Sequence, residues 1–112
     1  DDPPVPELGG IPRHIFGNYD GYVKALEIAN SPAIGVCLCC GTWMEGGKAF
    51  TGKDVFEAAR GFAKMGKLWK IHFRNVTAPG TEFVETYIDN GYTDMYKLMK
   101  TLVDVDFRGN LI

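Results

Sequence analysis

The apolar residues of this chain follow two different spacings. From Tyr19 to Ala29 they recur every three or four residues, the spacing of one helix face. The run AIGVCLCC (33–40) is apolar without polar alternation and predicts a strand buried on both faces. The helical spacing returns at residues 55–65 and 93–102, while residues 68–76 and the final Leu-Ile pair predict two more strands.

Turn-forming residues mark the ends of these elements. Residues 1–17 carry four of the six prolines and predict a loop, and so does the segment GTWMEGGKAF (41–50). Thr51 and Asp54 resemble a capping box and predict the start of the second helix, which Gly66 would end. Thr93 is the predicted cap of the third helix.

The order helix, strand, helix, strand, helix, strand predicts parallel βα units and a sheet covered on both faces. Alternation along KIHFRN (70–75) places Lys70, His72 and Arg74 on one face of a strand. Polar side chains on a covered strand cost several kcal/mol unless they are paired or open into a site. In barrels of βα units such a site lies at the carboxyl ends of the strands, which would bring these residues near Cys39 and Cys40.

Composition and charge exclude several classes of function. The formal net charge is −2 with scattered basic residues, which argues against a nucleic-acid partner. The longest apolar runs are far shorter than a membrane span, so no membrane partner is expected. Three cysteines crowded at 37, 39 and 40 make a poor disulfide framework and favour a reducing compartment, with the cytoplasm as the expected location.

Four blocks of the sequence resemble, in order, the D-mannonate dehydratase family. They are DDPPVPELGGIPR (1–13), NSPAIGVCLCCG (30–41), HFRNV (72–76) and TDMYKLMKTL (93–102) with DFRGNLI (106–112). The resemblance implies a metal-dependent enzyme with a (β/α)₈ TIM barrel that acts in sugar-acid and glucuronate catabolism. Its reaction would be dehydration of D-mannonate to 2-keto-3-deoxygluconate. Residues 1–112 would then be one partial barrel domain, truncated at both ends.

The resemblance also implies roles for individual residues. The family's cysteine and histidine metal ligands fall on Cys39 and His72, and the ion expected is Mn²⁺, with Fe²⁺ or Co²⁺ possible. Arg74 and Asn75 are candidate ligands of the sugar acid, although structural ion pairing is nearly as good an account of them. The other two ligands and the proton-transfer residues would lie outside this chain, so no catalytic residue is expected within it. A homo-oligomer is expected of the full-length enzyme.

Two residues depart from the family pattern, and two other hypotheses about the chain stay open. Cys40 stands where Gln or Thr is common and Ile88 where His is usual, so the substrate could be another sugar acid. The chain could also be a non-catalytic fragment, or a small α/β binding module without a metal role. Without the resemblance, Cys39 would be interpreted as a small buried hydrophobe, as Cys37 and Cys40 are here.

Overall fold

The computed structural model describes residues 7–12 and 15–112. Arg13, part of the first family block, lies outside the described residues. The helices of the described part are η1 (Ile15–Gly17), α1 (Tyr19–Ala29), α2 (Cys40–Thr51), α3 (Val55–Lys64) and α4 (Met95–Asp104). The strands are β1 (Glu7–Leu8), β2 (Ile11–Pro12), β3 (Val36–Cys39), β4 (Leu68–His72), β5 (Asn75–Val76), β6 (Glu85–Thr86) and β7 (Asn110–Leu111).

A parallel sheet forms the centre of the fold, with the strand order β3–β4–β7. Leu38 pairs with Ile71, and Ile71 pairs in turn with Leu111. The connections β3–α3–β4 and β4–α4–β7 are the crossovers that parallel strands require. The predicted order of alternating helices and strands, and the parallel pairing, are therefore confirmed.

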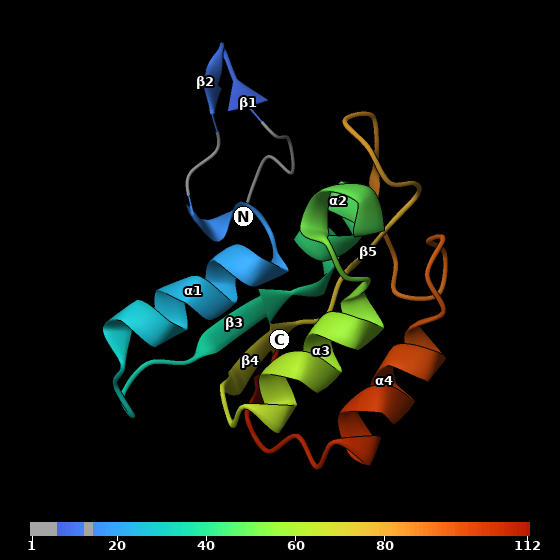
Figure 1. Cartoon of the computed structure of the whole chain (residues 1–112). Coiled ribbons are helices and arrows are strands. Elements are labelled where there is room, and N and C mark those ends of the chain that lie inside the picture. The colour runs from blue at the N-terminus through green and yellow to red at the C-terminus, as the bar shows by residue number, and fades with distance from the viewer. Residues whose placement is uncertain (1–6, 13–14) are drawn as a thin grey trace.

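The helices α1, α3 and α4 lie on one face of this sheet (Figure 1). Leu38 and Ile71 point to that face and are buried in the core. The core there is partly aromatic: the ring of Phe62 packs against the rings of Tyr19 and Trp43, with centroid distances of 4.7 and 6.1 Å. Burial of such large rings contributes to the hydrophobic stabilisation of this face.

The opposite face of the sheet is open within the described residues, so the prediction that both faces are covered is wrong for this part of the chain. Cys37 is exposed there, and Lys70 and His72 are only half-buried. The physical reason is that α1 and the two crossover helices, α3 and α4, pack on the same side, as helices do around a barrel. Lys70 therefore needs no buried partner on this face.

Two helix predictions are confirmed closely. Helix α1 has the predicted bounds and is capped by Asn18, whose side chain accepts a hydrogen bond from Gly21 N. Helix α3 has nearly the predicted bounds and begins with a capping box between Asp54 and Glu57. The predicted box of Thr51 and Asp54 is wrong, because Thr51 is the last residue of α2 and Asp54 itself is the N-cap. For α4 the N-cap is Asp94 rather than the predicted Thr93.

Three segments differ from the prediction. Residues 41–50 are not a loop, because they belong to α2. The strand predicted over 68–76 is broken after His72, and β5 pairs antiparallel with β6 instead of continuing the sheet. In the predicted N-terminal loop, β1 and β2 form a hairpin around Gly9 and Gly10, both at positive φ, as a two-residue turn requires.

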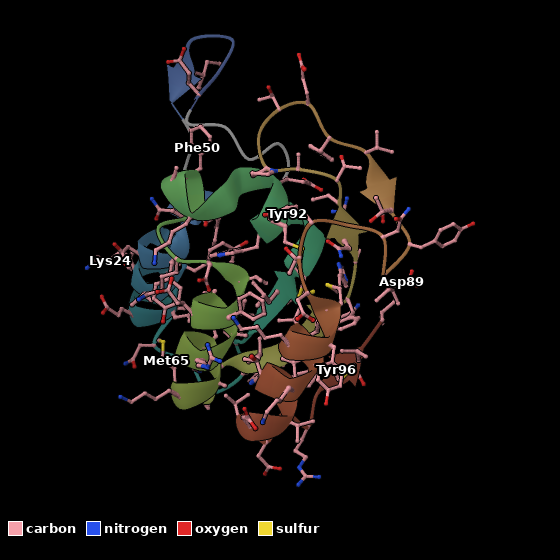
Figure 2. The ribbon with its side chains drawn as sticks, turned by 90° about the vertical axis from the view of Figure 1, so that its right-hand side faces the viewer. Lys24, Phe50, Met65, Asp89, Tyr92 and Tyr96 are labelled. Atoms are coloured by element: carbon pink, nitrogen blue, oxygen red, sulfur yellow. The ribbon has the colours of Figure 1, made fainter. Side chains whose placement is uncertain are left out.

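The outer surface of α4 carries a largely solvent-exposed side chain, Tyr96, which points away from the core (Figure 2). Tyr92 lies nearer to α2 in the same view. No helix among the described residues is long and apolar enough to cross a membrane.

Candidate functional site

Cys39 and His72 lie side by side at the carboxyl ends of neighbouring strands. They are register partners in the parallel ladder between β3 and β4. Both side chains are half-buried, and both belong to the face of the sheet that the helices leave open. The structure thus brings together the two residues that the resemblance assigned to a metal.

Cys37 is also part of this neighbourhood. Its Sγ lies 3.4 Å from Nε2 of His72. The interpretation of Cys37 as a small buried residue is wrong, because its position on the open face leaves it exposed. Partial desolvation nevertheless raises the pKa of the Cys37 thiol. A second sulfur therefore lies beside the histidine, and any test of Cys39 has to control for it.

Cys40 lies on the opposite face from Cys39, as the alternation predicted, and is fully buried. Burial raises the pKa of its thiol well above the ordinary value, so the group is held as a neutral thiol. Its packing within the core agrees with the structural interpretation of this cysteine.

Arg74 is held by acidic side chains from two other segments. Its Nη2 lies 2.6 Å from Oε1 of Glu45, and its Nε donates to Oε1 of Glu85 at 3.0 Å. Burial alone would lower the pKa of Arg74, but hydrogen bonds to Cys39 and Glu85 and the charge of Glu45 together raise it. The alternative of structural ion pairing is therefore realised for Arg74 in this structure.

Two side chains donate hydrogen bonds to the sulfur of Cys39. Thr42 Oγ1 lies 3.2 Å from Sγ, and Arg74 Nη1 lies 3.6 Å from it. Thr42 and Glu45 both come from α2, a segment for which the sequence predicts a loop. Both residues were missed for that reason, since a helix would have placed Thr42 and Glu45 three residues apart on one face.

Asn75 is fully buried, and its amide binds the backbone of the segment 88–93. Nδ2 donates to the carbonyl oxygens of Ile88 and Thr93, both at 2.9 Å, and Oδ1 accepts from Val76 N at 3.0 Å. These contacts account for the amide's donors within the protein. Binding of a sugar acid by Asn75 stays a prediction.

The segment that follows β5 is tied to α2 at two points. The hydroxyl of Tyr92 donates to the carbonyl oxygen of Met44 at 2.7 Å, and Gly80 N donates to the carbonyl oxygen of Glu45 at 2.7 Å. The loops before and after β6 are therefore hydrogen-bonded to α2, the helix that supplies Thr42 and Glu45.

Cys39 and His72 fit a divalent metal ion as a part of its ligand set. A thiolate and an imidazole are ligands accepted by Mn²⁺, Fe²⁺, Co²⁺ and Zn²⁺, and their adjacent positions on an accessible face suit a shared ion. Within residues 7–12 and 15–112, no group of three or more His, Cys, Asp or Glu side chains is placed to hold a metal. Further ligands would therefore have to come from outside the described residues.

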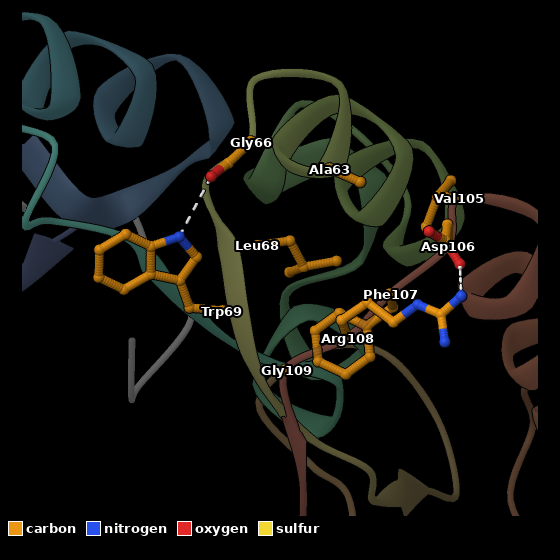
Figure 3. A pocket seen from close by; sticks show the side chains of 9 residues that line it. All are labelled: Ala63, Gly66, Leu68, Trp69, Val105, Asp106, Phe107, Arg108 and Gly109. Carbon is orange, nitrogen blue, oxygen red and sulfur yellow. Dashed lines mark hydrogen bonds and ion pairs between the residues drawn. The ribbon is translucent and has the colours of Figure 1, made fainter.

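A separate cavity of about 360 Å³ lies at the opposite end of the sheet (Figure 3). Leu68 at the start of β4, Trp69 and Phe107 line it, and Asp106 and Arg108 form an ion pair with each other at its edge. Trp69 Nε1 donates to the carbonyl oxygen of Gly66 at 3.1 Å. In a barrel of βα units this end serves stability, so the carboxyl end with Cys39 and His72 is the candidate site.

Comparison with known sequences gives the same assignment over the whole chain. The family model described as D-mannonate dehydratase (UxuA) matches residues 1–112. The mannonate dehydratase of Thermotoga neapolitana is 32% identical over 112 residues, covering 97% of this chain and 29% of the relative. That of Streptococcus suis is 33% identical over 113 residues, again covering 29% of the relative. The chain thus spans about 29% of the length of these relatives.

Solved structures agree with the sequence comparison. The crystal structure of mannonate dehydratase from Streptococcus suis serotype 2 matches 99% of this chain and 31% of its own length, with a TM-score of 0.82 and 32% identity. A xylose isomerase domain protein from Planctomyces limnophilus matches 84% of this chain with a TM-score of 0.68 at 21% identity, which supports the fold alone. The predicted fold class, parallel βα units of a TIM barrel, is confirmed. With the match over all 112 residues, these similarities establish that the chain belongs to the D-mannonate dehydratase family.

Proposed function

We propose that this chain supplies part of the metal-binding rim of an enzyme that dehydrates D-mannonate to 2-keto-3-deoxygluconate. The observation that carries the proposal is the register pairing of Cys39 with His72 at the carboxyl ends of β3 and β4. Family membership supports the substrate class, a small sugar acid. The departures at Cys40 and Ile88 leave a related sugar acid as the alternative substrate.

Dehydration next to a carboxylate removes a proton and builds negative charge on the substrate. A bound divalent ion, Mn²⁺ being the expected one, would neutralise that charge as a Lewis acid. In this chain Cys39 and His72 would hold the ion. The open face of the sheet leaves both side chains accessible to it. Fe²⁺ and Co²⁺ suit the same two ligands.

Metal binding by the purified chain tests the ligand assignment. Equilibrium dialysis against Mn²⁺ and Co²⁺ would compare the native chain with the Cys39→Ala, His72→Ala and Cys37→Ala variants. We expect uptake to fall strongly in the first two variants, and Cys37→Ala, a change on the same strand face, is the matched control. Equal uptake by all four proteins would remove the case for this site and favour a binding module without a metal.

Activity tests the reaction itself. The 112-residue chain with Mn²⁺ and D-mannonate is expected to form no 2-keto-3-deoxygluconate, because only two of the implied ligands lie in it. A chimaera in which this chain replaces the matching segment of the Streptococcus suis enzyme is expected to turn over D-mannonate. His72→Ala should abolish that turnover and Cys37→Ala should not. A folded chimaera that is active with His72→Ala would contradict the proposal.

A further inference from the structure

Glu45 is a buried carboxylate that the family resemblance did not single out. Its side chain is 2% exposed, and Nη2 of Arg74 lies 2.6 Å from its Oε1. Moving a carboxylate out of water costs several kcal/mol unless a well-placed cation compensates for it. A charge buried this deeply restricts where the Arg74 guanidinium can lie.

All three nitrogens of that guanidinium have partners in the structure. Nη2 faces Glu45, Nε donates to Glu85, and Nη1 lies 3.6 Å from Sγ of Cys39. The planar fork that would bind a substrate carboxylate is thus already used by protein groups. This arrangement favours the structural ion pairing of Arg74 over the substrate-binding role that was the other prediction for it.

The sulfur of Cys39 is contacted from two directions by groups that α2 positions. Thr42, in the first turn of α2, donates to it directly at 3.2 Å. Glu45, one turn further along the same helix, holds Arg74 against it. Groups that hydrogen-bond a metal ligand fix its orientation, and their loss commonly costs 10- to 100-fold in metal affinity.

We propose that Glu45 and Arg74 form a positioning pair that, together with Thr42, orients the Cys39 sulfur toward the open face of the sheet. Arg74 is then a positioning residue, and Glu45 acts through it. The inference rests on the proposed metal role of Cys39. It also gives a reason for the ion pair of Glu45 and Arg74 next to the Cys39 sulfur.

The test uses Co²⁺ alone, because cobalt bound to sulfur gives a charge-transfer absorption band in the near ultraviolet. All proteins would carry Cys37→Ala, so that the band reports Cys39; Cys40 is buried. The variants are Glu45→Gln, Arg74→Lys and Thr42→Val, with Glu85→Gln as the matched control, because Glu85 contacts the same arginine from an exposed position. Circular dichroism would establish that each variant is folded.

We expect Glu45→Gln and Arg74→Lys to raise the Kd for Co²⁺ by about tenfold and to shift or diminish the band. Glu85→Gln should stay within about twofold of the parent. If Glu45→Gln does not fold, the milder Thr42→Val, which removes only the second donor, should still alter the band.

The outcomes separate this proposal from the proposed function. If the parent shows no band, or the band survives Cys39→Ala, the metal role of Cys39 fails and the positioning role fails with it. If the band depends on Cys39 but is unchanged in folded Glu45→Gln, Arg74→Lys and Thr42→Val, only the positioning role is wrong.

Discussion

Gly41 lies directly beneath the side chain of Arg74. A Cβ atom built on Gly41 would be 2.4 Å from Cγ of Arg74 and 2.6 Å from its Cζ and Nε. Real Cβ atoms do not approach other atoms so closely, so any larger residue at position 41 would displace the arginine. Gly41, two residues after Cys39, thus leaves room for Arg74 to reach both Glu45 and the sulfur of Cys39.

Gly41→Ala is therefore expected to destabilise the chain by about 1–3 kcal/mol, the usual cost of overpacking. Urea unfolding followed by circular dichroism would measure the change. The cost should become smaller in an Arg74→Ala background, since that substitution removes the atoms that the new methyl group meets. Equal costs in the two backgrounds would mean that the close approach of these residues is not the cause.

Asn75 supports a second prediction, because its buried amide binds two backbone carbonyl oxygens of the segment 88–93. Asn75→Asp keeps the shape of the side chain but replaces the donor with an acceptor. Each carbonyl left without a donor costs about 1–3 kcal/mol, so a large loss of unfolding free energy is expected. Hydrogen exchange should also become faster in residues 88–94.

The matched control for Asn75→Asp is Asn90→Asp, the same chemical change at an exposed position in the same segment. It should alter the unfolding free energy by no more than about 0.5 kcal/mol. If both variants lose the same stability, the effect comes from the added charge and not from the buried hydrogen bonds.

Much of the fold could be predicted because its signals are local. The bounds of α1 follow from apolar spacing and from the Asn30-Ser31-Pro32 stretch after it; Asn30 adopts the left-handed conformation that ends the helix. The apolar run before Gly41 is also a local signal, and it predicted β3. Its last residue, Cys40, already belongs to α2. Order and direction of the strands then followed from the crossovers.

Helix α2 could not be predicted from local preferences. It contains Gly46 and Gly47, and Gly47 has a φ of +61° that interrupts the helical geometry. Tertiary contacts compensate for this poor propensity. Trp43 Nε1 donates to the carbonyl oxygen of Lys53 at 2.8 Å, and Met44 is buried in the core. Such contacts connect residues whose proximity appears only after folding.

The positions of the two proposed ligands could be predicted from the sequence, but their surroundings could not. Cys39 and His72 were found through short motifs, and the parallel register placed them together. Glu45 and Thr42 lay in a segment interpreted as a loop, where neither residue carries a signal of its own. The break after His72 was hidden too, because no glycine or proline interrupts residues 68–76.

The capping box at the start of α3 supports a third prediction. Asp54 Oδ1 accepts a hydrogen bond from Glu57 N at 2.7 Å, and Glu57 Oε2 accepts one from Asp54 N at 2.9 Å. Asp54→Ala should cost about 0.5–2 kcal/mol of stability, because it leaves a helix N–H without its partner. Urea unfolding would measure it, and Asp54→Asn, which keeps a capping oxygen, should recover part of the loss. No recovery would show that the charge matters more than the cap.

Glu57 also predicts how stability changes in acid. The hydrogen bond from Lys48 and then that from the backbone of Asp54 lower the pKa of Glu57 below its ordinary value of 4.5. A carboxylate with a lowered pKa in the folded state favours folding above its unfolded pKa. That contribution is lost as the pH falls through the folded pKa, since the unfolded chain then binds the proton more readily.

Glu57→Gln should therefore unfold at a lower urea concentration than the native chain at neutral pH, and the difference should shrink as the pH is lowered below about 4.5. Urea midpoints measured at steps from neutral pH to about pH 3 would show this. Lys48→Met is the matched variant, because Lys48 is the main cause of the lowered pKa, and it should reduce the same acid-dependent difference. A difference in urea midpoint between the native chain and Glu57→Gln that stays constant across this range would mean that ionisation of the Glu57 carboxyl group makes no contribution to stability.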